Sequence, residues 1–475
     1  MSFRALLAVW MSKFVTIGLK IMGRGATSLP GVIAQRVYLL LPDRLLRQID
    51  TCVIVTGTNG KTTTTELLYA MLHSDDEPWL VNRGGANLIQ GILATLLQKT
   101  NWRGRLTVKR VLLEVDEATM RLVLPSIRPQ VLVLTNVLRD QLDRYGEIDQ
   151  TIMLLRNAAW GADTTLVTNA DDPLCVAISS INQKPVFFGY APMESTDETS
   201  VVDLVSGNQV RDGAFCEKCG ALLSYERYFY GQMGIYACPE CSFKRPELSF
   251  AGRVLDAGTA ASQLCVNEYA ATQDWRPSED REFLVPNPLK GLYNAYNLLA
   301  ATSAARTLGV SPSRIAEASK RFIQPLGRMQ VFPGHPERIL SLIKNPTGAD
   351  SVLSTVAQDA REKMVCFVIN DNFADGRDVS WLWDVDLEVF VENSPSTRYV
   401  CAGTRAADMA LRLAYAGVDR LDIKIVDDTE ALLLVGNEEA LPVYVLSTYT
   451  ALHPLVSLLT HAQPKEFRGK AVSAS

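Results

Sequence analysis

The sequence lacks the long apolar run of a membrane-spanning helix. Its one candidate, residues 3–22, is interrupted by Arg4, Lys13 and Lys20, whereas a spanning helix needs about 20 apolar residues with few or no charges. A secretory signal peptide would need a longer uninterrupted apolar run and a small-residue cleavage site. Two interpretations of this segment stay open. It is either a helix packed on the neighbouring domain or an amphipathic helix that rests on a membrane surface.

The sequence also lacks a basic charge excess and a disulfide framework. The net charge of −5 gives no support for a nucleic-acid-binding face, which normally needs a basic stripe. Of the nine cysteines, five are scattered singly among apolar neighbours, namely Cys52, Cys175, Cys265, Cys366 and Cys401. Scattered thiols indicate a reducing compartment, so we expect a cytoplasmic protein, located at the inner face of the membrane if the N-terminal segment rests there.

A chain of 475 residues is too long for one core, because cores stop growing at about 250–300 residues. β-branched apolar runs alternate with helical stretches, which predicts α/β domains built on parallel sheets. We predict an N-terminal helical segment (1–50), a central domain (51–325) and a C-terminal α/β domain (326–475). A segment rich in Cys, Tyr and Gly, about 206–247, reads as a module inserted in the central domain.

The strongest local signal is a phosphate-binding loop. A β-branched strand (51–56) leads into Gly57-Thr58-Asn59-Gly60-Lys61-Thr62-Thr63, and a helical pattern follows. In such a loop the backbone N–H groups approach the phosphates of ATP, the lysine meets the β- and γ-phosphates, and the threonine hydroxyl ligates Mg²⁺. The alternative is a chance glycine turn, but the strand and the helix lie where the mechanism requires them.

This loop departs from the general motif, because Val55 stands where the first glycine is expected. The variant Gly-Thr-Asn-Gly-Lys-Thr-Thr-Thr resembles the Mur ligase family, which includes the folylpolyglutamate synthetases. The resemblance implies that ATP phosphorylates a carboxylate and that an amine then attacks the acyl phosphate. It also implies that Glu114, at the end of an apolar strand, holds Mg²⁺. A carboxylate merely exposed at the strand end is the alternative.

Three further positions match the Mur ligase pattern. The resemblance places Asn294 and Asn297 near the adenine and lets Arg328 reach the nucleotide phosphates. Asn294 could instead cap the following helix, and Arg328 could be an exposed hinge residue. The chain departs from the family at two positions, where Gln141 and Tyr293 replace histidines. The first replacement puts a second metal ligand of the family in doubt.

Four cysteines form two pairs, Cys216-x₂-Cys219 and Cys238-x₂-Cys241, with 18 residues between the pairs. Two thiolate pairs at this spacing predict a tetrahedral Zn²⁺ site. Four thiolates leave no open coordination position, so the zinc would be structural. Disulfides are the alternative, and they conflict with a reducing compartment. The few basic residues between the pairs do not favour nucleic-acid binding.

A loop rich in aspartate follows an apolar strand in the C-terminal half. It reads Asn370-Asp371-Asn372-Phe373-Ala374-Asp375-Gly376-Arg377-Asp378. Functional loops gather at the carboxyl ends of strands in α/β sheets, although a solvated Asp-Gly turn would look similar. Together with the phosphate loop and the cysteine pairs, this loop resembles the MurT family, the synthetase subunits of lipid II isoglutaminyl synthase. Asp140-Gln141-Leu142-Asp143 and Asn345-Pro346-Thr347-Gly348 add to the resemblance, which covers about residues 23–453.

The MurT resemblance implies a Mur ligase-like fold with an inserted zinc ribbon and a C-terminal Rossmann-like domain. It implies that the α-carboxylate of D-glutamate in lipid II is activated by ATP and amidated by ammonia to D-isoglutamine. The ammonia would come from a separate glutaminase subunit of the GatD type. The resemblance further implies that an aspartate of this chain completes the Cys–His pair of that partner. Motif position assigns this role to Asp378, with Asp375 and Asp371 as alternatives.

The residues themselves support an external nitrogen source. A class I glutaminase needs a cysteine on a Gly-x-Cys-x-Gly elbow and a histidine that activates it. No cysteine of this sequence lies in that context, and the sequence has only four histidines. Two other functions remain open. One is a free-standing ligase that adds an amino acid to a muramyl peptide or folate, and the other is a zinc-ribbon binding protein with a degenerate ATPase domain.

Overall fold

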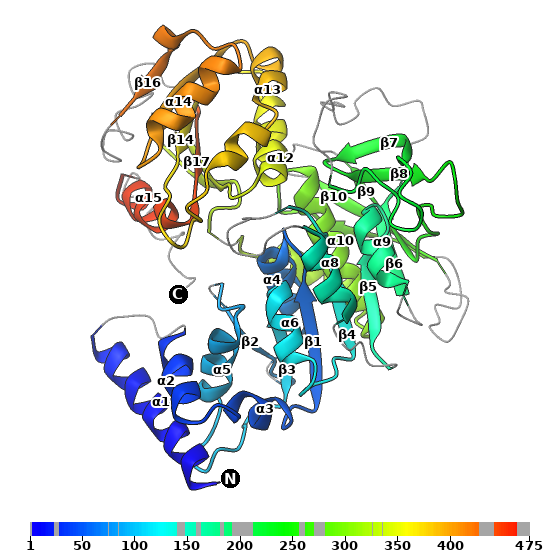
Figure 1. Cartoon of the computed structure of the whole chain (residues 1–475), viewed down its shortest axis with the longest axis vertical. Coiled ribbons are helices and arrows are strands. Elements are labelled where there is room, and N and C mark those ends of the chain that lie inside the picture. Colours follow the sequence, from blue (N-terminus) through cyan, green and yellow to red (C-terminus); the bar gives the residue numbers. More distant parts are fainter. Residues whose placement is uncertain are drawn as a thin grey trace.

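The computed structural model describes residues 2–22, 28–74, 76–83, 85–139, 148–157, 163–180, 185–191, 212–255, 262–269, 281–324, 326–334, 336–426 and 441–462. Figure 1 shows an N-terminal group of helices and a C-terminal α/β domain at opposite ends of the long axis, with a larger α/β domain between them. Within the described residues, no helix combines the length and the apolar character needed to cross a bilayer.

Three helices precede the first strand, α1 (Phe3–Ile21), α2 (Leu29–Val37) and α3 (Leu41–Leu46). α1 begins where the Ser2 hydroxyl accepts a hydrogen bond from the Ala5 N–H, an N-cap that satisfies one exposed backbone donor. α1 packs on α2 and α5, and α3 also packs on α5. These helices therefore form an outer layer on one face of the central sheet (Figure 1).

The central domain is built on a nine-stranded sheet in the order β11-β10-β9-β6-β5-β4-β1-β3-β2. The strands are β1 (Thr51–Thr56), β2 (Leu80–Val81), β3 (Arg110–Glu114), β4 (Val131–Leu134), β5 (Thr165–Asn169), β6 (Pro185–Tyr190), β9 (Phe250–Leu255), β10 (Gln263–Glu268) and β11 (Arg281–Pro286). The helices are α4 (Lys61–Leu72), α5 (Ile89–Gln98), α6 (Glu117–Val123), α8 (Ile148–Asn157), α9 (Pro173–Ser179), α10 (Leu292–Thr307) and α11 (Pro312–Lys320).

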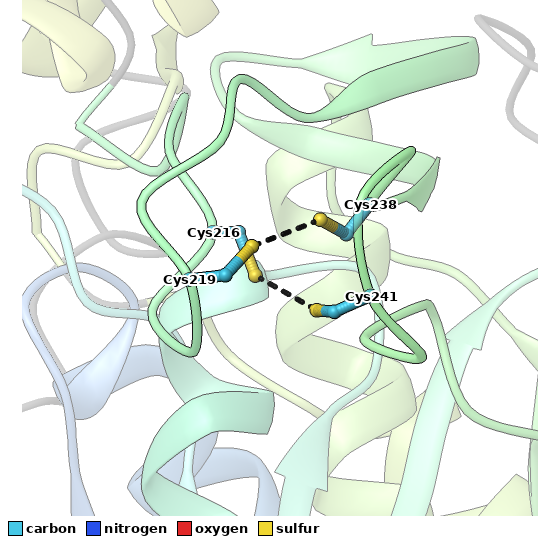
Figure 2. Close-up of side chains that lie close together, drawn as sticks. All are labelled: Cys216, Cys219, Cys238 and Cys241. Atoms are coloured by element: carbon cyan, nitrogen blue, oxygen red, sulfur yellow. Dashed lines mark hydrogen bonds between the residues drawn. The ribbon is translucent and has the colours of Figure 1, made fainter.

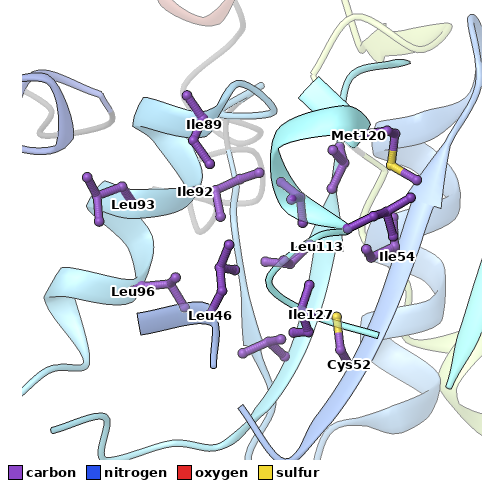
Figure 3. Close-up of a cluster of buried hydrophobic side chains, with 14 of the residues drawn as sticks. Leu46, Cys52, Ile54, Ile89, Ile92, Leu93, Leu96, Leu113, Met120 and Ile127 are labelled. Atoms are coloured by element: carbon purple, nitrogen blue, oxygen red, sulfur yellow. The ribbon is translucent and has the colours of Figure 1, made fainter. Parts of the chain in front are cut away.

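The alternation of side chains along β1 explains why helices cover both faces of this sheet. Cys52 and Ile54 point into the core shared with α5 and α6, where Leu113 and Met120 also lie (Figure 3). Val53 and Val55 point into a second core beneath α4 and α10. Both faces of a parallel strand are buried in this way, so its sequence is apolar throughout.

One edge of the sheet differs from the predicted parallel arrangement. β9 pairs in parallel with β6, but β10 runs antiparallel to both β9 and β11. Parallel strands need a long crossover connection, usually a helix, whereas antiparallel strands need none. No helix lies between β9, β10 and β11 among the described residues. The sheet is therefore mixed, and these three strands were not predicted.

The inserted module and the C-terminal domain complete the fold. The module contains a two-stranded hairpin, β7 (Ser224–Tyr230) and β8 (Met233–Ala237). The C-terminal sheet has the order β12-β13-β17-β14-β15-β16 and is parallel except for β12. Its strands are β12 (Gln330–Phe332), β13 (Arg338–Leu342), β14 (Lys363–Val368), β15 (Thr397–Ala402), β16 (Ile423–Ile425) and β17 (Val443–Ser447). Its helices are α12 (Pro346–Ala357), α13 (Leu387–Asn393), α14 (Ala406–Tyr415) and α15 (Tyr449–Ala462), with 3₁₀ turns at Ser380–Asp384 and Arg420–Asp422. The predicted α/β fold class is thus confirmed, since both large sheets are mainly parallel and carry helices.

Candidate functional site

The phosphate loop connects the carboxyl end of β1 to the N-terminus of α4. Gly60 adopts φ +83, and a Cβ at this position would lie 1.9 Å from Oδ1 of Asn297 on α10. Both the positive φ and the close approach require glycine. The loop therefore brings its backbone directly against α10. The N-terminus of α4 lies at the same place, and a helix N-terminus is suited to binding an anion.

Residues at the end of the neighbouring strand β4 fix the shape of the loop. The Thr135 hydroxyl donates to the Asn59 carbonyl at 2.8 Å. The Asn136 side chain accepts from the Asn59 N–H at 2.8 Å and donates to the Asn59 carbonyl at 3.0 Å. β1 and β4 are parallel neighbours, so their carboxyl ends meet here. The predicted residues that follow, Asp140 to Gly146 with Gln141, lie outside the described residues.

Lys61 is the buried cation of the loop. Its ammonium donates to the Thr58 carbonyl at 3.2 Å and to the Gly57 carbonyl, and it forms an ion pair with Glu117 at 3.2 Å. Glu117 is the first residue of α6, so the pair joins the starts of two helices. Sequence analysis did not identify Glu117, because its partner lies 56 positions earlier in the chain.

Glu114 ends β3 and faces the loop from a fully buried position. Burial raises the pKa of its carboxyl, and the Lys61 ammonium, the Thr62 hydroxyl and the Asn87 amide oppose that shift. The Asn82 side chain accepts from the Glu114 N–H at 2.8 Å and donates to its carbonyl at 2.7 Å, which fixes the strand end. The alternative of an exposed carboxylate is therefore wrong. A buried carboxylate beside a threonine hydroxyl offers the hard oxygen ligands that Mg²⁺ prefers.

The C-terminal domain touches the phosphate loop directly. Lys344 donates to the Thr58 carbonyl at 3.3 Å. The amides of Asn345 and Asn59 exchange two hydrogen bonds, at 3.2 and 3.1 Å. Asn345 also caps α12 by accepting from the Gly348 N–H. Its position before Pro-Thr-Gly indicates a helix start in the sequence, but only the fold shows that the same side chain reaches the loop.

A cavity of about 550 Å³ lies between the two domains. Its walls combine the loop and β3 with residues of the C-terminal domain, including Lys344, Asp375 and Tyr449. The predicted residues that line it are Thr58, Asn59, Gly60, Lys61, Thr62, Thr63, Glu114, Asn297 and Arg328. Three tyrosines, Tyr230, Tyr293 and Tyr449, add aromatic surface to the walls.

Two of the residues predicted to bind the nucleotide, Gly57 and Asn294, do not line this cavity. Asn294 accepts from the Asn297 amide at 3.2 Å and donates to the Lys290 carbonyl at 2.8 Å, so it orients Asn297. The N-cap of α10 is Gly291, so the alternative in which Asn294 caps the helix is wrong. Gly57 is the first residue of the loop and does not face the cavity. A Cβ at this position would contact the Thr135 side chain.

Arg328 reaches the cavity from the interdomain connection. Burial lowers the pKa of its guanidinium, while Tyr293 and Glu114 favour the charged form. Its neighbour Met329 adopts φ 57, the one positive φ recorded for a non-glycine residue among the described residues. Gly327 on the other side has φ +70. The interdomain connection around Arg328 therefore has an unusual backbone conformation and is not an exposed hinge.

The four paired cysteines come together in the inserted module, as predicted. The Sγ atoms of Cys216 and Cys241 are 3.6 Å apart, those of Cys219 and Cys238 are 3.4 Å apart, and all four lie within 4.8 Å of one another (Figure 2). Tetrahedral zinc with Zn–S bonds of about 2.3 Å places sulfurs about 3.8 Å apart. The cluster therefore fits a zinc ion, and the donor set fits a structural site.

The hairpin of this ribbon extends from the cysteines to the cavity. The Gln232 amide donates to the Asp172 carboxylate at 2.6 Å and to the Val137 carbonyl at 2.9 Å. Arg245 forms an ion pair with Asp171 at 2.6 Å, and Asp171 is fully buried. Tyr230, at the hairpin turn, lines the cavity. The ribbon is thus one of the supports of the site.

The three aspartates of the C-terminal loop have different surroundings. Asp371 forms an ion pair with Arg405 at 2.9 Å. Asp375 is buried and accepts hydrogen bonds from both the backbone N–H and the hydroxyl of Thr450. Asp378 is exposed and accepts from the Ser380 N–H at 2.8 Å. Only Asp378 presents its carboxylate mainly to the surface.

Comparisons with known proteins agree with this architecture. Residues 55–209 match the family model of the Mur ligase middle domain, and residues 342–452 match that of the MurT ligase C-terminal domain. The chain is 30% identical over 456 residues to the "Lipid II isoglutaminyl synthase (glutamine-hydrolyzing) subunit MurT" of Staphylococcus aureus strain COL, covering 96% of this chain and 98% of that protein. It is 32% identical over 465 residues to the subunit of the same name from Streptococcus pneumoniae, covering 96% and 97%.

Solved structures show the same fold at low sequence identity. A pseudomurein peptide ligase type C from Methanothermus fervidus has a TM-score of 0.61 at 19% identity and covers 87% of this chain and 79% of that chain. The MurF ligase from Thermotoga maritima in complex with ADP has a TM-score of 0.58 at 15% identity and covers 90% and 83%.

Proposed function

Because this chain belongs to the family of the MurT subunits of lipid II isoglutaminyl synthase, we propose that it is the ATP-dependent ligase subunit that amidates lipid II in the cytoplasm. ATP phosphorylates the α-carboxylate of D-glutamate and leaves as ADP. Ammonia then attacks the acyl carbon, phosphate leaves, and loss of a proton gives D-isoglutamine. The observation that carries this proposal is the cavity whose walls come from both the phosphate loop and the C-terminal domain.

The residues at the cavity fit ATP and Mg²⁺. When bound, these groups supply the phosphoryl group and neutralise its negative charge. The loop N–H groups and Lys61 would bind the phosphates, Thr62 and Glu114 would hold the metal, and Arg328 would approach the phosphates from the interdomain connection. Asn297 and Tyr293, which also line the cavity, would contact the nucleoside of ATP. Lys344, which donates to the Thr58 carbonyl, would offer a further cation in the same cavity.

The remaining chemistry is the supply of ammonia, and we propose a glutaminase of the GatD type as the partner subunit. The five cysteines outside the ribbon are buried, and burial raises the pKa of each thiol. A glutaminase nucleophile needs the opposite, a thiolate accessible to substrate. The surroundings of these cysteines therefore support a nitrogen source outside this chain.

Asp378 is the residue that we assign to the partner's Cys–His pair. An aspartate there would orient the imidazole and stabilise its cation. Asp378→Asn should lower glutamine-driven turnover at least tenfold and leave ammonia-driven turnover unchanged. Asp371→Asn tests one of the two alternative assignments, and it should leave glutamine-driven turnover unchanged because Asp371 is paired with Arg405 within the domain. Equal loss of both activities in Asp378→Asn would contradict the assignment.

The function as a whole is tested by measuring the mass of the product by mass spectrometry. The chain is incubated with ATP, Mg²⁺, lipid II and either glutamine or ammonium, with and without a GatD-type glutaminase. We expect a product lighter by about one mass unit, because hydroxyl is replaced by amide, and we expect it from glutamine only when both proteins are present. A product that gains a whole amino-acid residue without the partner would instead identify a free-standing ligase.

A further inference from the structure

Helix α1 is apolar on two opposite faces, and only one of them is covered. Ala5, Ala8, Val9, Ser12 and Leu19 are buried against the neighbouring helices. On the other side Phe3, Phe14, Ile17 and Ile21 are 72%, 66%, 48% and 81% exposed. Residues 11, 14 and 18 positions after Phe3 lie close to whole numbers of turns, about 3, 4 and 5, so these four side chains share one face. This set of four is called the outer stripe below.

Trp102 extends the outer stripe beyond the helix. Its ring lies 5.9 Å from that of Phe14, and it is half exposed. The Trp10 indole N–H donates to the Trp102 carbonyl at 2.8 Å, which ties this loop to α1. Tryptophan is the side chain that most favours the boundary between lipid and water, since it is apolar with one polar N–H group.

The charged residues on α1 and on the loop that carries Trp102 are all basic. No aspartate or glutamate occurs before Asp43, while Arg4, Lys13 and Lys20 lie on α1 itself. The loop that carries Trp102 adds the exposed side chains of Arg103 and Arg105, and no acidic residue lies between positions 88 and 113. The chain as a whole has a net charge of −5, so this local excess has the opposite sign to the molecule.

A contiguous apolar stripe is rarely left exposed on a soluble protein without an interaction partner. An apolar helix face bordered by lysine and arginine is the pattern of a helix lying in a membrane interface. We propose that the outer stripe of α1, together with Trp102 and the surrounding basic residues, binds the surface of an anionic lipid bilayer. α1 would lie parallel to the membrane and would not cross it.

This surface also suits the position of α1 in the molecule. Figure 1 shows α1 at the outer edge of the end opposite the C-terminal domain, with its long side toward solvent. A bilayer could therefore contact α1 along its length while the loop 370–378 stays distant from the lipid. The inference does not rest on the proposed function, although a lipid-linked substrate would be consistent with it.

The first test is sedimentation of the full chain with vesicles, in the absence of ATP and substrate. We expect binding to phosphatidylglycerol-containing vesicles that is at least tenfold stronger than to pure phosphatidylcholine, and weaker at high salt. The variant Phe14→Ser/Ile17→Ser/Ile21→Ser should lose at least tenfold in partitioning. A matched control, Leu284→Ser/Ile323→Ser/Leu421→Ser, removes three exposed apolar side chains elsewhere and should bind as the wild type does.

Two further measurements locate the contact. Lys20→Gln/Arg103→Gln/Arg105→Gln should lose the preference for anionic lipid by about tenfold. Brominated lipid should quench tryptophan fluorescence, and Trp102→Phe should remove most of the quenching. Failure of the wild type to bind either vesicle, or unchanged binding by the outer-stripe variant, would overturn the proposal. So would a wild-type dimer that this variant converts to monomers, since the stripe would then be covered by a second copy.

Discussion

Lys61 shares a single ammonium group among two backbone carbonyls and Glu117. Lys61→Ala should reduce ATP hydrolysis at least a hundredfold, because the loop then lacks its phosphate cation. It should also lower the free energy of unfolding by about 3 kcal/mol, since removal of one partner leaves a buried charge unpaired. Steady-state hydrolysis and chemical denaturation measure the two effects.

The double variant Lys61→Ala/Glu117→Gln separates these effects. Its free energy of unfolding should return most of the way to the wild-type value, because no unpaired carboxylate remains. ATP hydrolysis should stay absent. Recovery of hydrolysis would show that Lys61 acts only by neutralising Glu117.

Asp350 on α12 predicts a pH dependence of stability. Burial raises the pKa of its carboxyl to about 7. The hydrogen bond from the Asp386 N–H and the Arg412 cation oppose this shift, while the charges of Asp386 and Asp384 add to it. The folded state therefore holds a proton that the unfolded state has released between about pH 4 and pH 7, so stability falls as pH rises through this window. Asp350→Asn should stabilise the protein by about 4 kcal/mol at pH 8 and by less than half of that at pH 5.

This prediction is checked by thermal unfolding of both proteins across pH 5 to 8. The asparagine keeps the oxygen that accepts from the Asp386 N–H, so the main change is the lost charge. A stability difference that is independent of pH would contradict the raised pKa.

Single residues were predictable where the signal was local. The order of loop residues from Gly57 to Thr63 and the cysteine spacing each follow from chemistry within one short segment, and Glu114 follows from its place at a strand end together with the family resemblance. Glu117 and Lys344 were not identified as site residues, because each acts through contacts with a distant part of the chain. The roles of the site residues in catalysis remain predictions.

At the scale of elements, the ribbon hairpin links the cysteine cluster to the cavity through Gln232 and Tyr230. Cys219→Ser/Cys238→Ser should reduce bound zinc from about one per chain to near zero and raise the KM for ATP several-fold, with a smaller effect on kcat. Metal analysis and steady-state kinetics measure these changes. Cys265→Ser, outside the cluster, is the control and should keep its zinc.

If the double variant lost zinc but kept its KM for ATP, the ribbon would support only its own fold. Gln232→Ala gives an independent readout, because it removes the bonds to Asp172 and Val137 without touching a cysteine. Like the double cysteine variant, it should raise the KM for ATP, but its zinc content should stay constant.

Most strands of the parallel region were predictable as elements because they are short apolar runs. The two-residue strand β2 and the strand β6, which contains Pro185 and Gly189, were not predicted. Strands β9 to β11 were not predicted. Polar residues such as Arg253 and Asn267 interrupt the apolar runs of β9 and β10, and the edge strand β11 is mostly accessible and resembles a loop in sequence. β11, for example, has one buried residue among six. The helix predicted after the phosphate loop is confirmed as α4.

At the scale of the whole molecule, the connection at Gly327 controls how the two domains meet. A Cβ at Gly327 would lie 2.5 Å from Leu452 on α15, and its φ is +70. Gly327→Ala should therefore displace Arg328 and raise the KM for ATP at least fivefold, besides a stability loss of about 1 kcal/mol.

Gly309→Ala is the matched control for this change. Gly309 has φ +84 but no atom within 4 Å of an added Cβ, so it should show the same stability loss without a change in KM. Equal kinetic effects of the two variants would indicate general backbone strain as the cause.

The division of the cavity between two domains has a consequence for how the protein is made. The ribosome releases the phosphate loop early, whereas Thr448 and Tyr449 on the opposite wall emerge only after both sheets have been synthesised. Domains fold in the order of synthesis, so the nascent central domain can be stable while its site still lacks a wall. A chain whose synthesis stops before the C-terminal domain would therefore fold with an incomplete cavity. Such a chain should not hydrolyse ATP without substrate.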